Sequence, residues 1–143
     1  MTVLGESTER ILAMSKELWD KGLAVRKEVL GAEYVERQLK TVDDFGMPMQ
    51  ELVTQSCWGW LWARPQLPRK LRSLVNLGML SALNRPNEFK THVKGALTNG
   101  CTREEIREVL LQVAVYCGMP AGVDAPSYLT STLVAMFFPS LSS

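Results

Sequence analysis

Three side chains in this sequence have the chemistry for a reaction that needs no cofactor: His92, Arg72 and Glu51. His92 is the single histidine, and an imidazole with an ordinary pKa of about 6.5 can deliver a proton near neutral pH. The guanidinium fork of Arg72 can hold a carboxylate. Glu51 is a further candidate, as an acid that faces the same pocket. Each also has a structural interpretation: a packed or solvated histidine, an interhelical ion-pair partner, and a surface acid.

Aromatic and small side chains are the candidates for lining such a pocket. Trp58 and Trp60 belong to a group of three tryptophans within five residues, which is a dense cluster. Tyr116, Cys117 and Pro120 form a second group near the expected end of a helix. The alternatives are that the tryptophans belong to the core or an interface, that Tyr116 is a core tyrosine, and that Cys117 is a packed small apolar group.

The elements that must position these side chains are all predicted to be helices. Apolar residues recur with helical spacing, and the alternation typical of strands is missing. Thr102 and Glu105 have the spacing of a capping box, and Asn99-Gly100 has the form of an αL cap. The expected helices cover about residues 7–30, 32–40, 44–63, 68–83, 86–98, 102–117 and 121–138. The sequence therefore predicts an all-α fold, a single-domain bundle of about six or seven helices over residues 1–143.

Two of these segments have more apolar surface than one core requires. In segment 44–63, one apolar stripe comprises Met49, Leu52, Val53, Cys57, Trp60 and Leu61, and a second comprises Trp58 and Trp62. A helix with two apolar faces needs two neighbours, which here are the core and either a second subunit or a ligand. Segment 74–83 is apolar nearly all round and is expected to be a central buried helix. A homo-oligomer is expected, with exposed apolar side chains at Trp58, Trp62, Met136, Phe137 and Phe138.

Composition excludes several classes of function. The net charge is +1 with 46% apolar and 22% charged residues, so neither nucleic acid nor an anionic membrane surface is an expected partner. No apolar run reaches the roughly 18 residues of a membrane span, and no leader peptide is recognisable. Three cysteines without a CxxC pair favour free thiols in a reducing, cytoplasmic location and argue against a thiolate zinc site. No cofactor or metal motif is present.

Several motifs, in order, resemble the carboxymuconolactone decarboxylase family. They are QELVT, WG and WARP within residues 50–74, and the run from His92 through NG and TREEIREVLLQVAVYCGMPA to residue 121. With residues 22–31, which look like the family's N-terminal helix, the resemblance covers about residues 20–125. It implies an all-helical, cofactor-free protein that assembles as a homotrimer or homohexamer. It also implies decarboxylation of a small carboxylated lactone in the catabolism of aromatic compounds.

A sister branch of the family resembles alkylhydroperoxidase D and depends on thiols. Its pattern is a glutamate, a CxxC twelve residues later, and a histidine four residues after the second cysteine. Alignment on His92 places Ser73, Arg85 and Glu88 at the glutamate and the two cysteine positions. Because both thiols are missing, peroxide reduction by that route is excluded.

The decarboxylase branch fits better, with one departure at Trp60. The family pattern reads Trp-Gly-Glu where this chain has an indole in place of the carboxylate, and an indole cannot transfer protons at neutral pH. Loss of CO₂ beside an unsaturated lactone leaves a dienolate, which His92 would protonate while Arg72 holds the departing carboxylate. Two alternatives stay open: isomerisation or cyclisation of a polyketide-like or terpenoid substrate in secondary metabolism, and a non-catalytic oligomeric binding subunit.

Overall fold

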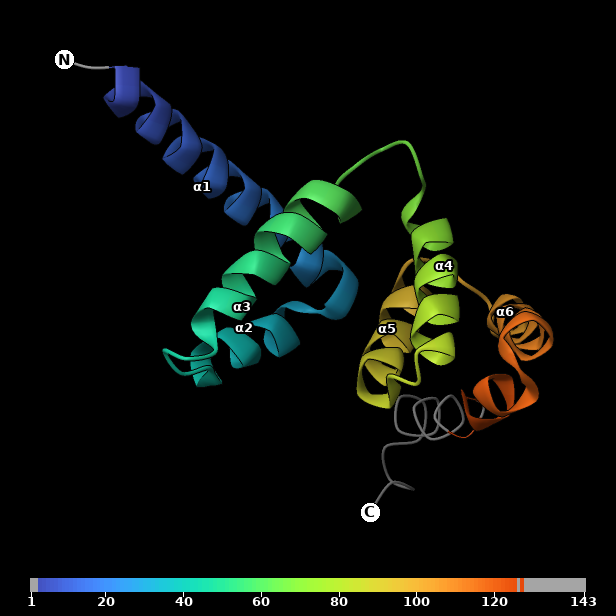
Figure 1. The fold of residues 1–143 in the computed structure, drawn as a ribbon. Coiled ribbons are helices and arrows are strands. Elements are labelled where there is room, and N and C mark those ends of the chain that lie inside the picture. The colour runs from blue at the N-terminus through green and yellow to red at the C-terminus, as the bar shows by residue number, and fades with distance from the viewer. Residues whose placement is uncertain (1–2, 126, 128–143) are drawn as a thin grey trace. The chain divides into compact units, whose positions relative to one another are not determined.

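The structure is a computed structural model that describes residues 3–125 and 127, with side chains from Ser15 onward (Figure 1). Its elements are α1 (Val3–Leu30), α2 (Ala32–Thr41), α3 (Met47–Leu52), η1 (Val53–Trp62), α4 (Arg69–Ala82), α5 (Pro86–Thr98) and α6 (Arg103–Cys117). Helix continues from residue 119 to 125 after a break at Gly118. Residues 3–125 contain no strand, so the predicted all-α class is confirmed.

The chain divides into two compact units, which we call the N-terminal unit (residues 1–66) and the C-terminal unit (residues 67–143). The single domain expected from the sequence stays a prediction. Most of the expected helix 121–138 lies outside the described residues, and so do Met136, Phe137 and Phe138. Within the described helices, none combines the length and the hydrophobicity that crossing a bilayer would require.

The N-terminal unit is built on a close crossing of α1 and η1. A side-chain carbon at Gly22 would collide with the carbonyl oxygen of Thr54, and one at Gly59 would collide with the carbonyl oxygen of Leu18. The two backbones therefore touch where a larger residue would hold them apart. Beside the crossing, Val25 and Val29 of α1 pack with tryptophans of η1 in a small buried cluster.

The helix expected over 44–63 differs from the structure in two ways. It is divided into a short α-helix, α3, and a π-helix, η1. The expected exposure is also reversed, because Trp58 and Trp62 are 2% and 4% exposed and stack at 5.0 Å, whereas Met49 and Trp60 are exposed. A π-helix holds more residues per turn than the 3.6 of an α-helix, so the directions of its side chains differ from those that an α-helical spacing predicts. In this register, both tryptophans face the core.

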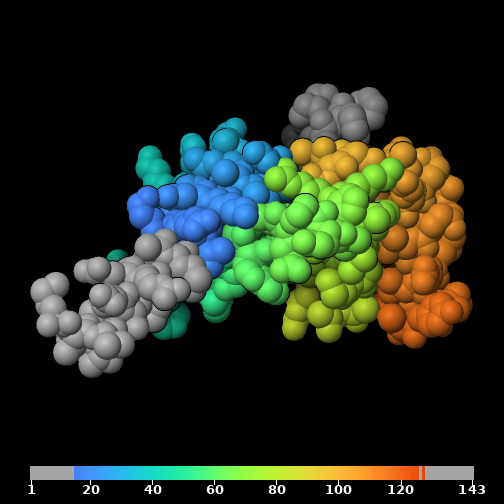
Figure 2. Space-filling model, turned by 90° about the horizontal axis from the view of Figure 1, so that it is seen from above, coloured from blue at the N-terminus to red at the C-terminus, as the bar shows by residue number. Residues whose placement is uncertain are grey.

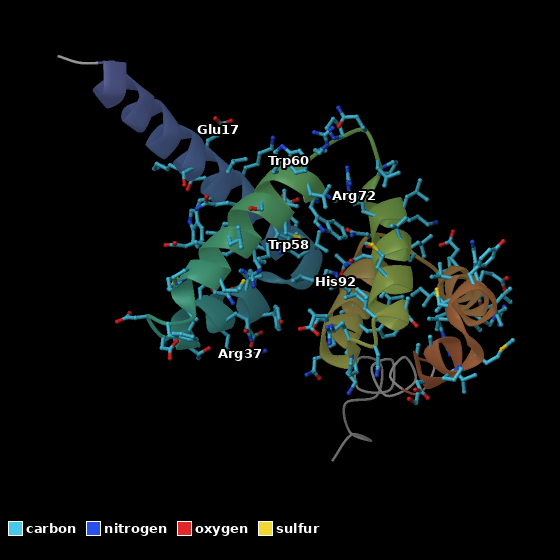
Figure 3. All side chains as sticks on the ribbon, viewed as in Figure 1. Glu17, Arg37, Trp58, Trp60, Arg72 and His92 are labelled. Carbon is cyan, nitrogen blue, oxygen red and sulfur yellow. The ribbon has the colours of Figure 1, made fainter. Side chains whose placement is uncertain are left out.

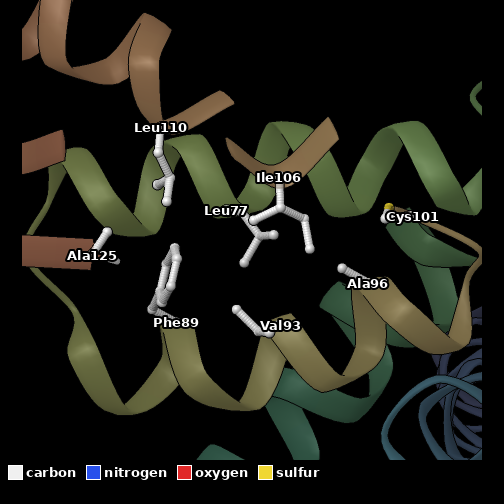
Figure 4. Packing of buried hydrophobic residues seen from close by; sticks show 8 residues of the cluster. All are labelled: Leu77, Phe89, Val93, Ala96, Cys101, Ile106, Leu110 and Ala125. Atoms are coloured by element: carbon white, nitrogen blue, oxygen red, sulfur yellow. The ribbon is translucent and has the colours of Figure 1, made fainter. Parts of the chain in front are cut away.

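The C-terminal unit has a larger apolar core (Figure 4). Phe89, Val93 and Ala96 of α5 face Leu77 of α4 and Ile106 of α6. Polar bonds fix the ends of the helices: Asn99 Nδ2 donates to Ser73 Oγ (3.0 Å), and Ser81 Oγ donates to the carbonyl oxygen of Ala121 (2.7 Å). Both bonds of the capping box between Thr102 and Glu105 are present, as predicted. Gly100 has a φ of +85° at the predicted αL cap.

The expectation that segment 74–83 is buried all round is wrong for the described chain. Helix α4 packs mainly against α5 and α6, and its buried residues Ser73, Leu77 and Ser81 lie on one face. Its other side carries apolar side chains four residues apart, and a second row follows on α6 and beyond. This apolar stripe comprises Leu71, Val75, Met79, Leu83, Leu111, Val115, Met119 and Val123. Figure 2 shows the surfaces of α4 and α6 next to each other within the unit.

Candidate functional site

His92 lies on α5, one turn after Phe89, at the edge of the face that packs into the C-terminal core (Figure 3). It is partly buried. Burial lowers the pKa of His92 from its ordinary 6.5 to about 4, and the nearby Glu88 carboxylate only partly opposes this shift. The imidazole is therefore uncharged at neutral pH. The expectation that this ring titrates near its ordinary value is wrong, because the sequence does not reveal how far the helix face is desolvated.

Arg72 lies near the start of α4 in the same unit and is partly buried (Figure 3). Its neighbour Ser73 accepts a hydrogen bond from Asn99, just after the end of α5, whereas His92 lies nearly two turns earlier on α5. The structure thus places the two predicted groups on adjacent, packed helices but at different levels. A ligand that contacts both must extend along α5, or use the reach of the arginine side chain.

Three predicted site residues lie on α3 and η1 of the N-terminal unit. Glu51 is exposed on α3. Trp58 packs in the core of the unit, which is the structural alternative considered for it. Trp60 is 57% exposed, and the guanidinium carbon of Arg64 lies 5.1 Å from the centre of its ring. At the position of the family glutamate, the chain therefore presents an indole face that a cation already approaches.

The predicted group at the end of α6 borders a pocket of about 270 Å³ in the C-terminal unit. Cys117 and Pro120 line it together with Phe89, whereas Tyr116 does not and is 82% exposed. Both Tyr116 and Cys117 are exposed, so the interpretations of Tyr116 as a core residue and of Cys117 as a packed group are wrong for the described chain. The lining of the pocket thus combines the thiol of Cys117, apolar side chains and the guanidinium of Arg85.

Sequence reasoning did not select Arg85 for this pocket. It lies in the turn between α4 and α5, directly after Asn84, which adopts a φ of +51°. Asparagine is among the few residues that adopt this left-handed conformation readily, and the turn directs the chain into α5. The sequence signal that could have indicated Arg85 is its position between two turn-forming residues, Asn84 and Pro86. Asp124 adds an acid to the same lining.

Sequence reasoning also missed Arg26, which is 6% exposed in the N-terminal unit. Its Nη1 donates hydrogen bonds to Gln50 Oε1 (3.0 Å) and Thr54 Oγ1 (3.1 Å). A signal was present, because Arg26 follows Gly22 by four residues and precedes Val29 by three, so it shares their buried face. A charge within an apolar helical stripe is expected to be buried with polar partners.

The described residues offer no group of three or more histidine, cysteine, aspartate or glutamate side chains that could hold a metal ion. The candidate site groups of the C-terminal unit are the neutral imidazole of His92, the guanidinium groups of Arg72 and Arg85, and the thiol of Cys117. The N-terminal unit adds a buried guanidinium, an exposed carboxylate and an exposed indole. These groups can bind anions and transfer protons.

Comparisons with known proteins identify the family of this chain. The model of the carboxymuconolactone decarboxylase family matches residues 48–130. The chain is 46% identical over 112 residues to nitrosuccinic acid decarboxylase of Metarhizium robertsii, which covers 78% of each chain. It is 40% identical over 106 residues to 4-carboxymuconolactone decarboxylase of Acinetobacter baylyi, which covers 74% of this chain and 79% of the relative. The chain therefore belongs to the carboxymuconolactone decarboxylase family.

Proposed function

We propose that this protein is a decarboxylase that removes CO₂ from a small carboxylic acid without a cofactor. The observation that carries the proposal is its similarity to two decarboxylases, one named for nitrosuccinic acid and the other for 4-carboxymuconolactone. Both names denote acids in which an electron-withdrawing group can accept the electron pair that CO₂ leaves behind. A substrate of this kind supplies its own electron sink, so the enzyme has to stabilise an anion and deliver one proton.

His92 is the proposed proton-transfer group. In the free protein its ring is neutral at pH 7, because burial lowers its pKa to about 4. A bound anion next to the ring would raise that pKa, since an opposite charge stabilises the imidazolium. Protonation of His92 would then follow substrate binding. The carbanion that forms when the C–CO₂ bond breaks would take this proton, leaving the ring neutral again.

Arg72 is the proposed carboxylate-binding group of the C-terminal unit. A guanidinium can hold the departing carboxylate through two parallel hydrogen bonds and keep it ionised until the C–C bond breaks. Cys117, Pro120 and Tyr116 are proposed as substrate-lining residues. Two of these three border the pocket of about 270 Å³, whose lining includes neither His92 nor Arg72.

On the N-terminal unit, Glu51 and Trp60 remain proposed contributors because both are exposed. Trp58 is the weakest of the proposed substrate contacts, since it already packs against Trp62. The exposed indole of Trp60 favours a second candidate function. A larger, less polar substrate, polyketide-like or terpenoid, would be isomerised or cyclised instead.

We further propose that the protein acts as a homotrimer or homohexamer. The support is the apolar stripe on α4, α6 and the residues that follow, because exposed apolar side chains that recur along helices are typical of subunit interfaces. Substitution of Val75 by aspartate should lower the mass measured by light scattering, whereas Lys94→Asp, on α5, should not. A monomeric parent protein would contradict this proposal. The modest net charge and the three unpaired cysteines support a small-molecule partner and a cytoplasmic location.

The test is turnover of nitrosuccinate and of 4-carboxymuconolactone, followed as loss of substrate and release of CO₂. We expect His92→Ala to lower kcat by about 10²–10⁴-fold, the usual contribution of general acid–base catalysis. The matched control is Lys94→Ala, an exposed residue two positions further on α5, which should retain activity. Turnover that survives His92→Ala would contradict the assigned role of His92.

A folded parent protein that releases no CO₂ from either acid would contradict the proposed reaction. Trp60→Glu restores the family residue and separates the two enzyme functions. If Trp60→Glu creates lactone decarboxylation that the parent lacks, the parent acts on a different substrate. Ligand binding without turnover in both proteins, unchanged by His92→Ala, would favour a binding subunit.

A further inference from the structure

Among residues 15–66, whose side chains the structure describes, the guanidinium of Arg26 is the one strongly buried charge that the proposed reaction does not use. It belongs to α1 and reaches across to α3 and η1, where it hydrogen-bonds the amide oxygen of Gln50 and the hydroxyl of Thr54. The Nε atom is buried and, among the described residues, finds no hydrogen-bond acceptor. The guanidinium of Arg26 therefore has five N–H donors but hydrogen-bonds only two neutral acceptors among the described residues.

The charge of Arg26 is also uncompensated. Its hydrogen-bond partners are an amide and a hydroxyl, and no carboxylate among residues 15–125 forms an ion pair with it. The remaining groups that influence it are the phenol of Tyr34 and the thiol of Cys57. Burial lowers the pKa of Arg26 and raises that of Cys57, so the thiol stays protonated and does not supply the missing negative charge. An isolated buried cation is strongly disfavoured unless an anion pairs with it.

Several groups around the guanidinium are themselves only partly buried. They are Gln50, which accepts from Nη1, and Tyr34 and Cys57, which influence the charge of Arg26. The arrangement offers what an anion receptor needs: a buried cation, two polar neighbours that orient it, and an N–H group without an acceptor among the described residues.

We propose that Arg26, with Gln50 and Thr54, forms a binding site for the carboxylate of a small organic acid in the N-terminal unit. A planar carboxylate matches the fork of N–H groups that the two neutral partners leave unused. The choice of a small organic acid as the ligand rests on the proposed function. The site itself rests only on the burial and the hydrogen bonds of Arg26.

The experiment measures the melting temperature of the full chain in chloride-free buffer while succinate is added. Succinamide, the uncharged amide counterpart, is the control for effects that do not depend on the anion. We expect saturating succinate to raise the Tm by about 4 °C or more, because a ligand that binds only the native state stabilises it. Succinamide should have no such effect. Absence of a succinate-specific rise would overturn the proposal.

Two variants assign the effect to this site. Arg26→Gln should abolish the succinate-dependent rise. Gln50→Glu places a carboxylate where the amide oxygen now accepts the 3.0 Å hydrogen bond, and so supplies the anion internally. We expect Gln50→Glu to raise the Tm without ligand and to lose most of the response to succinate. If Gln50→Glu has the parent Tm and the parent response, the proposal is wrong, even if Arg26→Gln does not fold.

The carboxylate could instead come from a second copy of the chain. In that case the Tm of the parent would rise with protein concentration in the absence of succinate, Arg26→Gln would remove that dependence, and succinate would have no effect. That result would overturn the small-acid site. Failure of the proposed function is a separate observation: a protein that releases no CO₂ can still show a succinate-dependent Tm that Arg26→Gln abolishes.

Discussion

The two units of this chain pack their helices together in different ways. The N-terminal unit brings helix backbones into contact through Gly22 and Gly59 and buries a guanidinium beside the crossing. In the C-terminal unit, the space between α4, α5 and α6 is filled with side chains such as Phe89 and Leu77, and a close backbone approach occurs at Gly122, beside Leu110. Its most perturbed ionisable group is an imidazole, His92. The N-terminal unit thus buries a group that stays charged, Arg26. The C-terminal unit partly buries a group that can gain or lose its charge, His92.

The comparison shows how the packing mode determines which polar groups a helical unit can carry. Beside the crossing, the long side chain of Arg26 reaches from α1 to Gln50 and Thr54, whose amide and hydroxyl groups hold it. In the C-terminal unit, the ionisable His92 lies at the edge of the core, where burial is partial. The edge is where a proton-transfer group is useful, because solvent and substrate can both reach it.

The largest effect we expect distinguishes the two packing modes with one glycine from each unit. Gly59→Ala should lower the free energy of unfolding of the N-terminal unit by more than about 4 kcal/mol, because the added methyl meets a backbone that cannot move aside. Gly78→Ala in α4 should be neutral or stabilising by about 0.5–1 kcal/mol, since its methyl would lie 3.5 Å from Val109 at ordinary contact distance.

Urea unfolding followed by hydrogen exchange of peptides from each unit measures both variants. Equal destabilisation by the two alanines would contradict the difference in packing. So would a Gly59→Ala protein whose N-terminal peptides exchange as slowly as those of the parent.

The second prediction concerns side-chain packing in the C-terminal unit. Leu77→Ala removes a fully buried side chain and should lower the free energy of unfolding by about 3 kcal/mol. Leu71→Ala, on the exposed side of the same helix, should have much less effect on unfolding and should instead weaken self-association. Urea denaturation at several protein concentrations separates the two. A large, concentration-independent loss with Leu71→Ala would mean that this side of α4 is buried within the chain.

The third prediction contrasts the two ionisable groups by acid titration. The pKa of His92 is lower in the folded state than in the unfolded state, so the unfolded chain binds a proton that the folded chain does not bind until about pH 4. The stability of the C-terminal unit should be complete above about pH 6.5 and should fall by on the order of 2 kcal/mol as the pH drops toward 4. Arg26 stays charged across this range and should add no such dependence.

His92→Gln isolates this contribution, because the carboxylates that also titrate in acid are unchanged. The variant should show a flatter dependence of unfolding free energy on pH than the parent, and Lys94→Gln should match the parent. A His92→Gln protein with the parent pH profile would show that the imidazole titrates normally in the folded state.

The smallest effect concerns the start of α6. Thr102→Ala removes the acceptor for the Glu105 amide and should cost about 1 kcal/mol in the C-terminal unit. Thr102→Ser retains the hydroxyl and should retain most of the stability. Thermal unfolding of both variants measures the difference, and an alanine variant as stable as the serine variant would contradict the contribution of the cap.

The sequence allowed prediction of features that depend on local signals. The capping box of Thr102 and Glu105, the proline start of α5 and the glycine at its end follow from short motifs whose geometry is local. The family resemblance was likewise predictable, because it depends on motifs in order. These signals located most of the helices and the chain positions of His92 and Arg72.

Features that depend on tertiary packing could not be predicted in the same way. The π-helical register of η1 turned Trp58 inward, although an α-helical wheel placed it outside the main stripe. The burial that lowers the pKa of His92 depends on the surroundings of α5 and not on its sequence alone. Cys117 lines a pocket because the chain breaks at Gly118 and returns toward Ser81, a tertiary contact that no local pattern shows.

The π-helical register also makes the length of segment 53–62 a structural constraint in its own right. Deletion of one residue there would allow the backbone to close as an ordinary α-helix, with hydrogen bonds one residue shorter. A deletion between Trp58 and Trp62 would also change their separation from four residues to three, and so disturb the stack of their rings at 5.0 Å. In this segment a single-codon deletion is therefore expected to be more damaging than most substitutions, even though it removes no catalytic group.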